Sequence, residues 1–562
     1  MYLLMIKSYP NNEQFITRSP TGSVEVREWD WEKEAERSIL LKAVSRWRDY
    51  ESDWFRGSFS RLPETVRVNP LHPDQEWVEA WLTNLNAKQI DWFFGPGSAW
   101  KLPFVRGSSE GETKIILNAL HKTGRVTRQE EVSMLPILAL NPQPGEIILD
   151  LCASPGSKTT QICEHMGDSG AVVANEIVSG RINTLVSNIQ RHSCKSSLVV
   201  QHDGRHIPMV PMEGYDRVLV DAPCTGSGTT RKNPDVWRKW IPSAGLSLHE
   251  LQFDLLKRGI SVTKPGGRIV YSTCSLDPIE NEAVVSRILL DGGVKLISAR
   301  NEIPEIPSNP GLTQWDILDD FGNSTDSQEF PDYLVPSNIE EVNSQLNSCM
   351  RVWNDKIDGG GFFLAIFEKN QQSYSSEKKE YNNSESGLIK DHPSYPQPVE
   401  KHLSNQFLDK WGSLPPNLWN RGKSLFWSTE EIYKIWNSVR ARRKKKNLIP
   451  GKRWHPLKVI HLGLIVAKIR KGELERITSK AARSLKKYIS KSLIEVDSEI
   501  IDLILIGDEP EYSTAFTNGS EFRGSYVLFD NSGFLLSVWI GKKVTAMISS
   551  EEKIILRKIR GI

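Results

Sequence analysis

Cysteine is scarce in this chain, and the spacings that cysteine-based scaffolds use are missing. The 562 residues include six cysteines, at positions 152, 163, 194, 224, 274 and 349, and no C-x-x-C pair. This pattern argues against a disulfide framework and against a structural zinc site. We therefore expect free thiols, a reducing compartment and no bound metal.

Long apolar runs are also absent. No segment approaches the roughly 20 apolar residues that a membrane-spanning helix needs, and the opening residues 1–7 lack the basic segment of a signal peptide. A composition of 39% apolar and 25% charged residues is typical of globular proteins. We expect an intracellular monomer without membrane contact, cytoplasmic or nuclear.

A Walker A motif is missing as well, although residues 147–160 read as a strand, a small-residue loop and a helix start. The first glycine of G-x-x-x-x-G-K-[ST] is absent, which argues against nucleoside triphosphate hydrolysis. Acids stand at the ends of three predicted strands, at Asp150, Glu176 and Asp203. Together they fit a nucleoside ligand at the carboxyl edge of a sheet. Each acid alone is equally well explained as a helix N-cap.

Two cysteines stand at the ends of predicted consecutive strands, in residues 218–224 and 269–274. Both segments are short apolar runs, typical of buried parallel strands. Because neighbouring strands lie about 4.8 Å apart, Cys224, Cys274 and Asp221 would face one crevice. A carboxylate and two thiols in one pocket indicate covalent catalysis.

Alternating strand-like and helix-like segments predict βαβ units and a mainly parallel sheet in the middle of the chain. A polar stretch with little to bury reads as a linker, and residues 524–541 predict two strands joined by a turn. The predicted divisions are an N-terminal α+β appendage at 1–114, a catalytic domain at 115–370, a linker at 371–400 and a C-terminal region at 401–562.

Basic residues are concentrated late in the chain, between 440 and 487, and are densest at 442–446. This run, between Trp436 and Trp454, can follow an RNA backbone by charge. A nuclear localisation signal or a solvated helix face are the alternatives. Residues 231–233, after the first cysteine loop, are also expected to hold phosphates, with a solvated loop as the alternative.

Four motifs together resemble the Sun-type RNA cytosine-5 methyltransferases. Residues 151–159 resemble their cofactor loop, and 124–130 the segment that leads into their core. Residues 221–229 resemble their Pro-Cys motif and 271–282 their Thr-Cys motif. The resemblance covers about 115–370 and is closest to the eukaryotic and archaeal tRNA branch, through 231–237 and 310–315.

The resemblance implies a doubly wound, mainly parallel α/β methyltransferase sheet that binds S-adenosylmethionine, and a C-terminal β-barrel similar to PUA-type RNA-binding modules. It makes Cys274 the nucleophile and Cys224 the thiol that assists release. Ser154 departs from the alanine usual in this branch, a small change that should not disturb binding. The implied cofactor contacts are Cys152, Ala153, Ser154, Pro155, Gly156, Ser157, Lys158, Glu176, Arg181, Asp203 and Asp221.

The chemistry explains these residue types. Carbon 5 of cytosine is a poor nucleophile until a thiolate adds to C6, and an acid at the ring nitrogen or amine, the role expected of Asp221, eases that addition. By chemistry alone either thiol can attack, and only the resemblance selects Cys274. A cytosine in a helix must first be flipped out or already be unpaired.

We therefore expect a tRNA cytosine-5 methyltransferase. A ribosomal RNA enzyme is the runner-up, a non-catalytic RNA-binding or ribosome-assembly factor is the alternative from another class, and DNA methylation would predict a dispensable Cys274.

Overall fold

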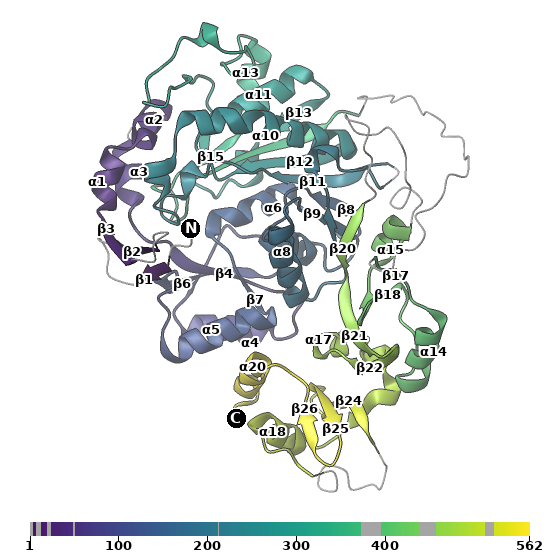
Figure 1. The fold of residues 1–562 in the computed structure, drawn as a ribbon. Coiled ribbons are helices and arrows are strands. Elements are labelled where there is room, and N and C mark those ends of the chain that lie inside the picture. The colour runs from purple at the N-terminus through teal and green to yellow at the C-terminus, as the bar shows by residue number, and fades with distance from the viewer. Residues whose placement is uncertain are drawn as a thin grey trace, which may run out of the picture.

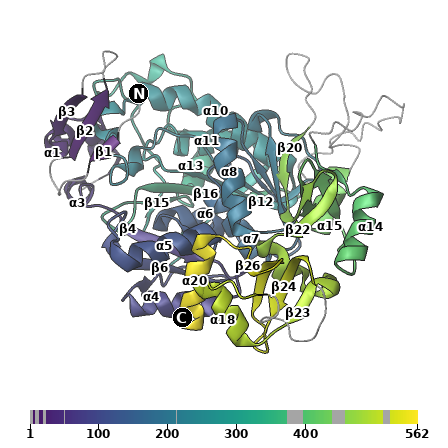
Figure 2. The same cartoon turned by 60° about the horizontal axis from the view of Figure 1, so that its bottom comes forward.

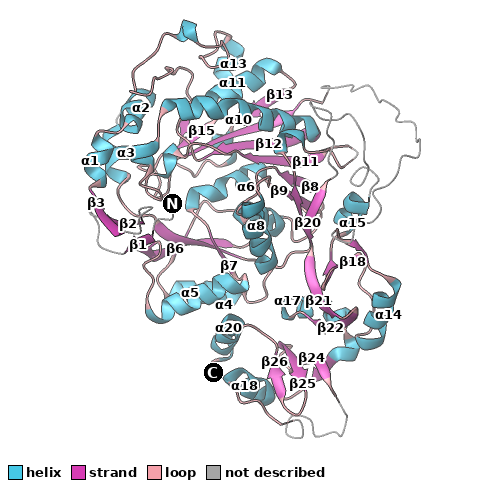
Figure 3. Cartoon of the chain, in the orientation of Figure 1, coloured by secondary structure: helices cyan, strands magenta, loops and turns pink. Residues whose placement is uncertain are grey.

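The structure is a computed structural model that describes residues 4–6, 13–18, 24–48, 51–211, 213–371, 395–437, 457–511 and 522–562. Its centre is a ten-stranded sheet with helices on both faces (Figures 1 and 3). Across the sheet the strands are β14 (Asn309–Pro310), β15 (Met350–Val352), β16 (Phe362–Lys369), β12 (Thr263–Thr273), β11 (Tyr215–Asp221), β8 (Ile147–Asp150), β9 (Ala171–Asn175), β10 (Ser197–Gln201) and β20 (Lys458–Leu462), with β13 (Val294–Ile297) beside β16.

The five strands from β12 to β10 are parallel, and the strands outside them are antiparallel to their neighbours. Strand order reverses between β8 and β11, which is where ligands bind in open α/β sheets. The predicted doubly wound arrangement is confirmed, but the sheet is mixed and not mainly parallel, because antiparallel strands flank the five parallel ones on both sides. The predicted site residues Asp221, Cys224 and Cys274 lie at the carboxyl ends of β11 and β12, on one edge of this sheet.

Apolar residues on both sides of the strands explain why the sheet is covered twice. Val218 and Val220 of β11 pack in the core on one face, and Leu219 packs in the core on the other, because side chains alternate along a strand. The first face carries α10 (Pro242–Val262), α11 (Glu282–Asp291) and α13 (Glu340–Leu346); the second carries α6 (Leu135–Leu140), α7 (Ser157–His165), α8 (Ser179–His192) and α12 (Ala299–Glu302). The short α9 (Val236–Lys239) precedes α10.

The N-terminal region contains two small sheets and extends beyond the predicted boundary at 114. Its last strand, β7, follows residue 114 and pairs with β4. The elements are β1 (Leu4–Ile6), β2 (Glu13–Arg18), β3 (Val24–Trp29), α1 (Trp31–Glu36), α2 (Ile39–Trp47), α3 (Glu51–Gly57), β4 (Pro63–Val68), α4 (Gln75–Asn84), β5 (Lys88–Gln89), β6 (Ser98–Val105), α5 (Gly111–Thr123) and β7 (Val126–Arg128).

The C-terminal region begins inside the predicted linker, since β17 lies within 371–400; residues 372–394 are outside the described ranges. It forms two open sheets, in the orders β17-β18-β19-β21-β22 and β23-β24-β25-β26. The elements are β17 (Gln397–Pro398), α14 (Lys401–Lys410), β18 (Leu418–Arg421), β19 (Ser424–Trp427), α15 (Glu430–Asn437), β21 (Leu464–Arg470), β22 (Glu473–Ile477), α17 (Ser479–Leu485), β23 (Leu493–Glu495), α18 (Ser498–Ile506), β24 (Gly524–Phe529), β25 (Leu535–Ile540), β26 (Val544–Ala546) and α20 (Ser550–Arg560).

The predicted hairpin near the C-terminus is confirmed, because β24 and β25 pair antiparallel. The predicted barrel is not confirmed. Among the strands that the structure describes, no sheet closes on itself. The sequence pattern of a hairpin predicts only the pairing of its two strands and does not determine how a sheet closes. The basic cluster at 442–446 lies outside the described residues.

One strand joins the C-terminal region to the central sheet. β20 pairs with β10, and Gly463 alone separates β20 from β21 of the next sheet. Gly463 has a φ of 54°, and a Cβ there would lie 2.2 Å from the carbonyl oxygen of Trp427. Only glycine fits this bend.

The C-terminal helix also contacts the N-terminal region. α20 lies along α5 in both views (Figures 1 and 2), and Ile555 packs with Leu117. Arg125 donates to Glu552 at 2.8 Å and also bonds Asp74. The C-terminal helix is thus attached to the N-terminal region. Across the described ranges, no helix is long and apolar enough to cross a membrane.

A buried ionic cluster ties β4 to the central domain. The fully buried Arg67 donates to Glu164 of α7, and Glu164 also lies 2.8 Å from His192 Nε2 of α8. Burial alone would lower the pKa of His192, but its contacts with Cys194 and Glu164 raise it to about 9. The folded protein therefore favours the charged imidazole.

This cluster predicts a pH dependence of stability. Because the folded-state pKa of His192 is raised from 6.5 to about 9, its contribution is complete below pH 6.5 and is lost as the pH rises through 9. His192→Gln keeps a donor but does not titrate. From pH 6.5 to 9 the unfolding free energy of wild type should fall by about 1 to 3 kcal/mol more than that of the variant.

Urea unfolding at the two pH values measures this difference. His402→Gln, at an exposed histidine, is the control and should keep the wild-type pH dependence. An identical pH dependence in wild type and His192→Gln would show that His192 is not charged in the fold.

Candidate active site

Pairing between β11 and β12 brings the two predicted thiols together. The strands are parallel, with Asp221 opposite Ser272. Cys274 directly follows β12, and Cys224 lies three residues beyond the end of β11. The two sulfurs are 3.3 Å apart. The predicted juxtaposition is therefore confirmed.

The two thiols are not equivalent. The hydrogen bond to Cys274, together with burial, raises the pKa of Cys224 well above that of an ordinary thiol. Either sulfur can donate in this S–H···S contact. Of the two thiols, Cys274 lines the cavity at the strand ends, which favours it as the nucleophile, a choice that the strand pattern alone left open.

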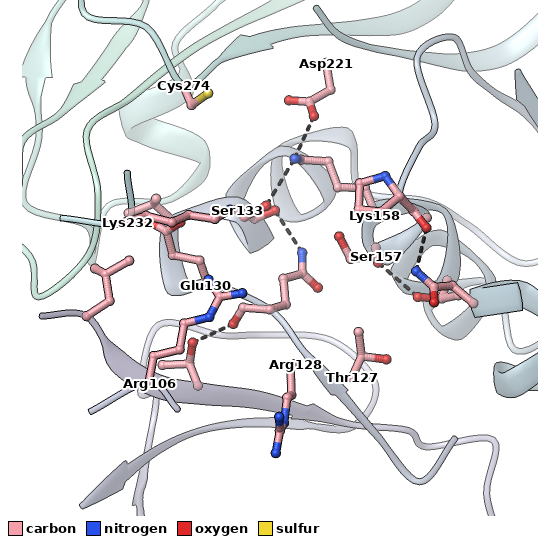
Figure 4. A pocket seen from close by; sticks show the side chains of 18 of the residues that line it. Arg106, Thr127, Arg128, Glu130, Ser133, Ser157, Lys158, Asp221, Lys232 and Cys274 are labelled. Atoms are coloured by element: carbon pink, nitrogen blue, oxygen red, sulfur yellow. Dashed lines mark hydrogen bonds and ion pairs between the residues drawn. The ribbon is translucent and has the colours of Figure 1, made fainter. Parts of the chain in front are cut away.

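Asp221 is held by two side chains at the end of β11. Lys158 Nζ lies 2.7 Å from one carboxylate oxygen, and the hydroxyl of Ser272 donates to the other at 2.8 Å. Lys158 also donates to Ser133 at 3.1 Å. Burial opposes the charge on Lys158, but the Asp221 carboxylate raises its pKa. Figure 4 shows this pair beside Cys274.

A cavity of about 460 Å³ lies between the strand ends and the N-terminal region, and Ser133, Lys158, Asp221 and Cys274 line it. Thr127, Arg128 and Glu130, from the predicted lead-in segment, form the opposite wall (Figure 4). Arg106 and Lys232 add exposed cations. Arg106 was not predicted, because no motif surrounds it. The cavity is large enough for a planar base and is open to a polyanion.

Glu280 fixes the two cysteine-bearing loops to each other. Its carboxylate accepts from the Thr225 backbone N–H at 2.9 Å and from Ser275 Oγ at 2.5 Å. Gln252 donates to the same group at 2.9 Å. Glu280 belongs to the predicted Thr-Cys motif but had no predicted role. The signal for it is an acid between two loops that both carry hydroxyl groups.

A second buried acid, Glu282, stabilises the loop that follows Cys274 through Arg351. Glu282 pairs with Arg351 of β15, and Arg351 donates to the Leu276 carbonyl at 2.9 Å. Both side chains are buried. A buried pair of this kind is costly to break, because the remaining charge loses its partner.

The predicted cofactor edge lies at the ends of β8 and β9. Burial raises the pKa of Asp150 to about 7, and its Oδ1 is buried without a hydrogen-bond partner. Glu176 is 4% exposed and lies beside two exposed apolar residues, Ile177 and Val178. An orphaned acceptor and an acid next to apolar surface fit a nucleoside with a flat ring.

The predicted loop 152–158 is shaped by backbone contacts. Ala153 N donates to the Asn175 carbonyl at 2.8 Å, and Arg181 donates to the Ser154 carbonyl at 2.8 Å. Gly156 has a φ of 106°, which a side chain would strain. The loop members are Cys152, Ala153, Ser154, Pro155, Gly156, Ser157 and Lys158, of which Pro155 to Lys158 line the cavity.

Asp203 and Arg231 are already engaged within the protein. Asp203 accepts from Arg205 N at 3.0 Å as an N-cap and also pairs with the Arg205 side chain. Arg231 is 3% exposed at its side chain and donates to backbone carbonyls and to Asp358. The prediction that Arg231 holds a phosphate is wrong, because its guanidinium is buried; the neighbouring Lys232 is exposed.

This geometry predicts an order of thiol reactivity. Cys274 should be alkylated first by iodoacetamide in the folded protein at pH 8, because it lines the cavity, whereas the contact with Cys274 and burial raise the pKa of Cys224. Peptide mass spectrometry against time measures the order. The urea-unfolded protein, in which all six cysteines should react at similar rates, is the control. Earlier modification of Cys224 than of Cys274 would contradict this order.

Comparison with known proteins places this site in a family. The family described as 16S rRNA methyltransferase RsmB/F matches residues 137–315, a range that contains both thiols. A Pyrococcus abyssi tRNA (cytosine(49)-C(5))-methyltransferase is 32% identical over 287 residues, covering 50% of this chain and 88% of that protein.

Two eukaryotic proteins are similar over a smaller share of their own length. A Saccharomyces cerevisiae multisite-specific tRNA:(cytosine-C(5))-methyltransferase is 37% identical over 49% of this chain and 44% of its own. A Drosophila melanogaster tRNA (cytosine(34)-C(5))-methyltransferase is 37% identical over 44% of this chain and 37% of its own. The chain thus spans less than half the length of these two relatives. Because the archaeal relative is covered almost throughout, the chain belongs to the RsmB/F family of methyltransferases, the Sun-type family that its motifs resemble.

Proposed function

We propose that this protein is an S-adenosylmethionine-dependent RNA cytosine-5 methyltransferase that acts on tRNA. The observation that carries the proposal is the 3.3 Å separation of Cys224 and Cys274, with Cys274 lining a cavity that Asp221 and Lys158 also line. The names of the similar tRNA enzymes support the substrate. The cofactor, when bound, supplies an electrophilic methyl group on a sulfonium.

The residues of the cavity divide the work on the base. Cys274 adds to C6 of the cytosine, and the negative charge that develops on the ring lies near the Lys158–Asp221 pair. Asp221 accepts from the exocyclic amine, and Lys158 supplies positive charge. Cys224 then assists release, either by moving a proton or by positioning the base that removes the C5 proton.

The residues at the strand ends are proposed to hold the cofactor. Glu176 accepts from the ribose hydroxyls, Ile177 and Val178 cover the adenine, and the loop 152–158 surrounds the methionine part. Asp203 is a further acceptor for the adenine only if it releases Arg205, because its carboxylate already accepts from that residue.

The two thiols give opposite outcomes on substitution. Cys224→Ala should block exit from the covalent state and accumulate protein joined to methylated RNA, whereas Cys274→Ala should form no adduct. Denaturing gels of wild type, both single variants and the double variant, each with tRNA and S-adenosylmethionine, should show one slow band, in the Cys224→Ala lane alone. Cys349→Ala, at a buried thiol outside the cavity, is the control.

A band in the Cys274→Ala lane would reverse the roles and move the enzyme toward the arrangement of DNA methyltransferases.

A ribosomal RNA substrate is the second candidate, favoured by the description of the matching family. Methyl incorporation into tRNA and into a 16S rRNA transcript, measured side by side, distinguishes the two.

The role of Glu176 predicts a loss of cofactor affinity. Removing a charged acceptor leaves ribose hydroxyls unpaired, a loss of about 1 to 3 kcal/mol, so Glu176→Ala should weaken S-adenosylmethionine binding roughly tenfold or more. Calorimetric titration measures this, with the exposed Glu213→Ala as the control. An unchanged dissociation constant would leave Glu176 with its bond to the Val178 N–H and its ion pair with Arg181, a purely local structural role.

A further inference from the structure

A second cavity lies where three parts of the chain meet, apart from the two thiols. It has a volume of about 290 Å³ and is formed by the C-terminal end of α8, the bend at Gly463 with β21, and the start of α17. The first of these belongs to the central domain and the others to the C-terminal region. The bend that only glycine can make therefore shapes this cavity.

The lining of this cavity is basic. Arg191, Lys468 and Lys480 line it, and no acidic residue does. Lys480 donates to the carbonyls of Gln190 and Arg191 at 3.1 Å, so it caps the end of α8. For the half-buried Arg191 and Lys468, no acidic partner occurs in the portion of the chain that the structure describes. Their charges remain available to an anion.

Arg191 connects the two cavities, because it lines both. The first cavity continues this charge with Arg106, Arg128 and Lys232, of which Arg128 lies 3.7 Å from the Glu64 carboxylate. A histidine between them responds to the same charge: burial, followed by repulsion from Arg191 and Arg128, lowers the pKa of His121 to about 4. Cations from the N-terminal, central and C-terminal regions thus form one basic track.

We infer that this track, from Arg128 through Arg191 to Lys468, binds the phosphate backbone of the RNA at a segment away from the target cytosine. A continuous row of cations with hydroxyl-bearing neighbours such as Ser187 and Ser193 suits a polyanion, because phosphate contacts need charge and donors but no base recognition. The inference rests on the proposed function for the identity of the RNA. It makes the junction with the C-terminal region part of the substrate-binding surface.

Salt-dependent binding tests the track. The double variant Arg191→Ser/Lys468→Ser is compared with wild type by fluorescence anisotropy, between 50 and 200 mM salt, using an unmodified tRNA transcript. A ten-nucleotide single-stranded RNA with one cytosine serves as the second probe. Affinity for the transcript should fall about tenfold, and the slope of log K against log salt should decrease by about 1 to 2, since fewer counterions are released. Affinity for the short RNA should change less than twofold.

Control variants separate charge from folding. Lys114→Ser/Arg300→Ser removes two exposed cations outside both cavities and should retain the wild-type slope. Arg191→Lys keeps the charge and should bind nearly as wild type does. Affinity for sinefungin should be the same in every variant, which shows that the central domain is intact.

Two outcomes would overturn the inference: a wild-type salt slope in the Arg191→Ser/Lys468→Ser variant, or equal losses of affinity for the long and short RNAs. Failure of the proposed function is separate. If wild type transfers no methyl group to tRNA but the slope still depends on Lys468, which lies outside the first cavity, the track stands and the catalytic proposal falls.

Discussion

Parallel hydrogen bonding between β11 and β12 determines where every group of the candidate active site lies. The register that sets Asp221 opposite Ser272 puts the carboxylate, the hydroxyl that holds it and the following Cys274 at one sheet edge. A slip of one residue would turn the Asp221 side chain to the other face of the sheet. The apolar residues that alternate along β11 oppose such a slip, because each is fixed in one of the two cores. The packing of β11 in the two cores therefore also fixes the positions of the catalytic side chains.

The loops beyond these strands need a different kind of support. Past the end of β12 the backbone has no sheet partners, and nearby hydroxyl groups accept from its N–H groups instead. Buried charged side chains then hold the loops in place. Glu280 bonds both cysteine-bearing loops, and Glu282 with Arg351 holds the segment that follows. Buried charges are weak contributors to net stability when they replace apolar packing, yet they specify one arrangement when all partners are present. The site is therefore built on rigid loops, as preorganised chemistry requires.

The sequence was sufficient to predict the sheet edge but not the surroundings of the site. Strand patterns and motifs identified Cys224, Cys274, Asp221 and the loop at 152–158, since short apolar runs ending in polar residues have few interpretations in an α/β fold. Arg106 and Arg191 escaped prediction, because a lone cation in a sequence carries no sign of the surface that it faces. Arg231 was misassigned for the same reason, as its burial depends on Asp358, distant in sequence. The barrel stays a prediction, because hairpin alternation does not determine how sheets close.

The position of β20 has a consequence for expression of the central domain alone. β10 would be the outer strand of the parallel sheet if the chain ended at residue 371, and its backbone groups would then face water. An uncovered, apolar edge strand is a template for pairing with another chain. The segment Leu198 to Val200 is fully apolar and buried in the whole protein. Fragments that lack residues 458–462 should therefore associate edge to edge, so the C-terminal region also acts as an internal solubility element for the domain that carries the thiols.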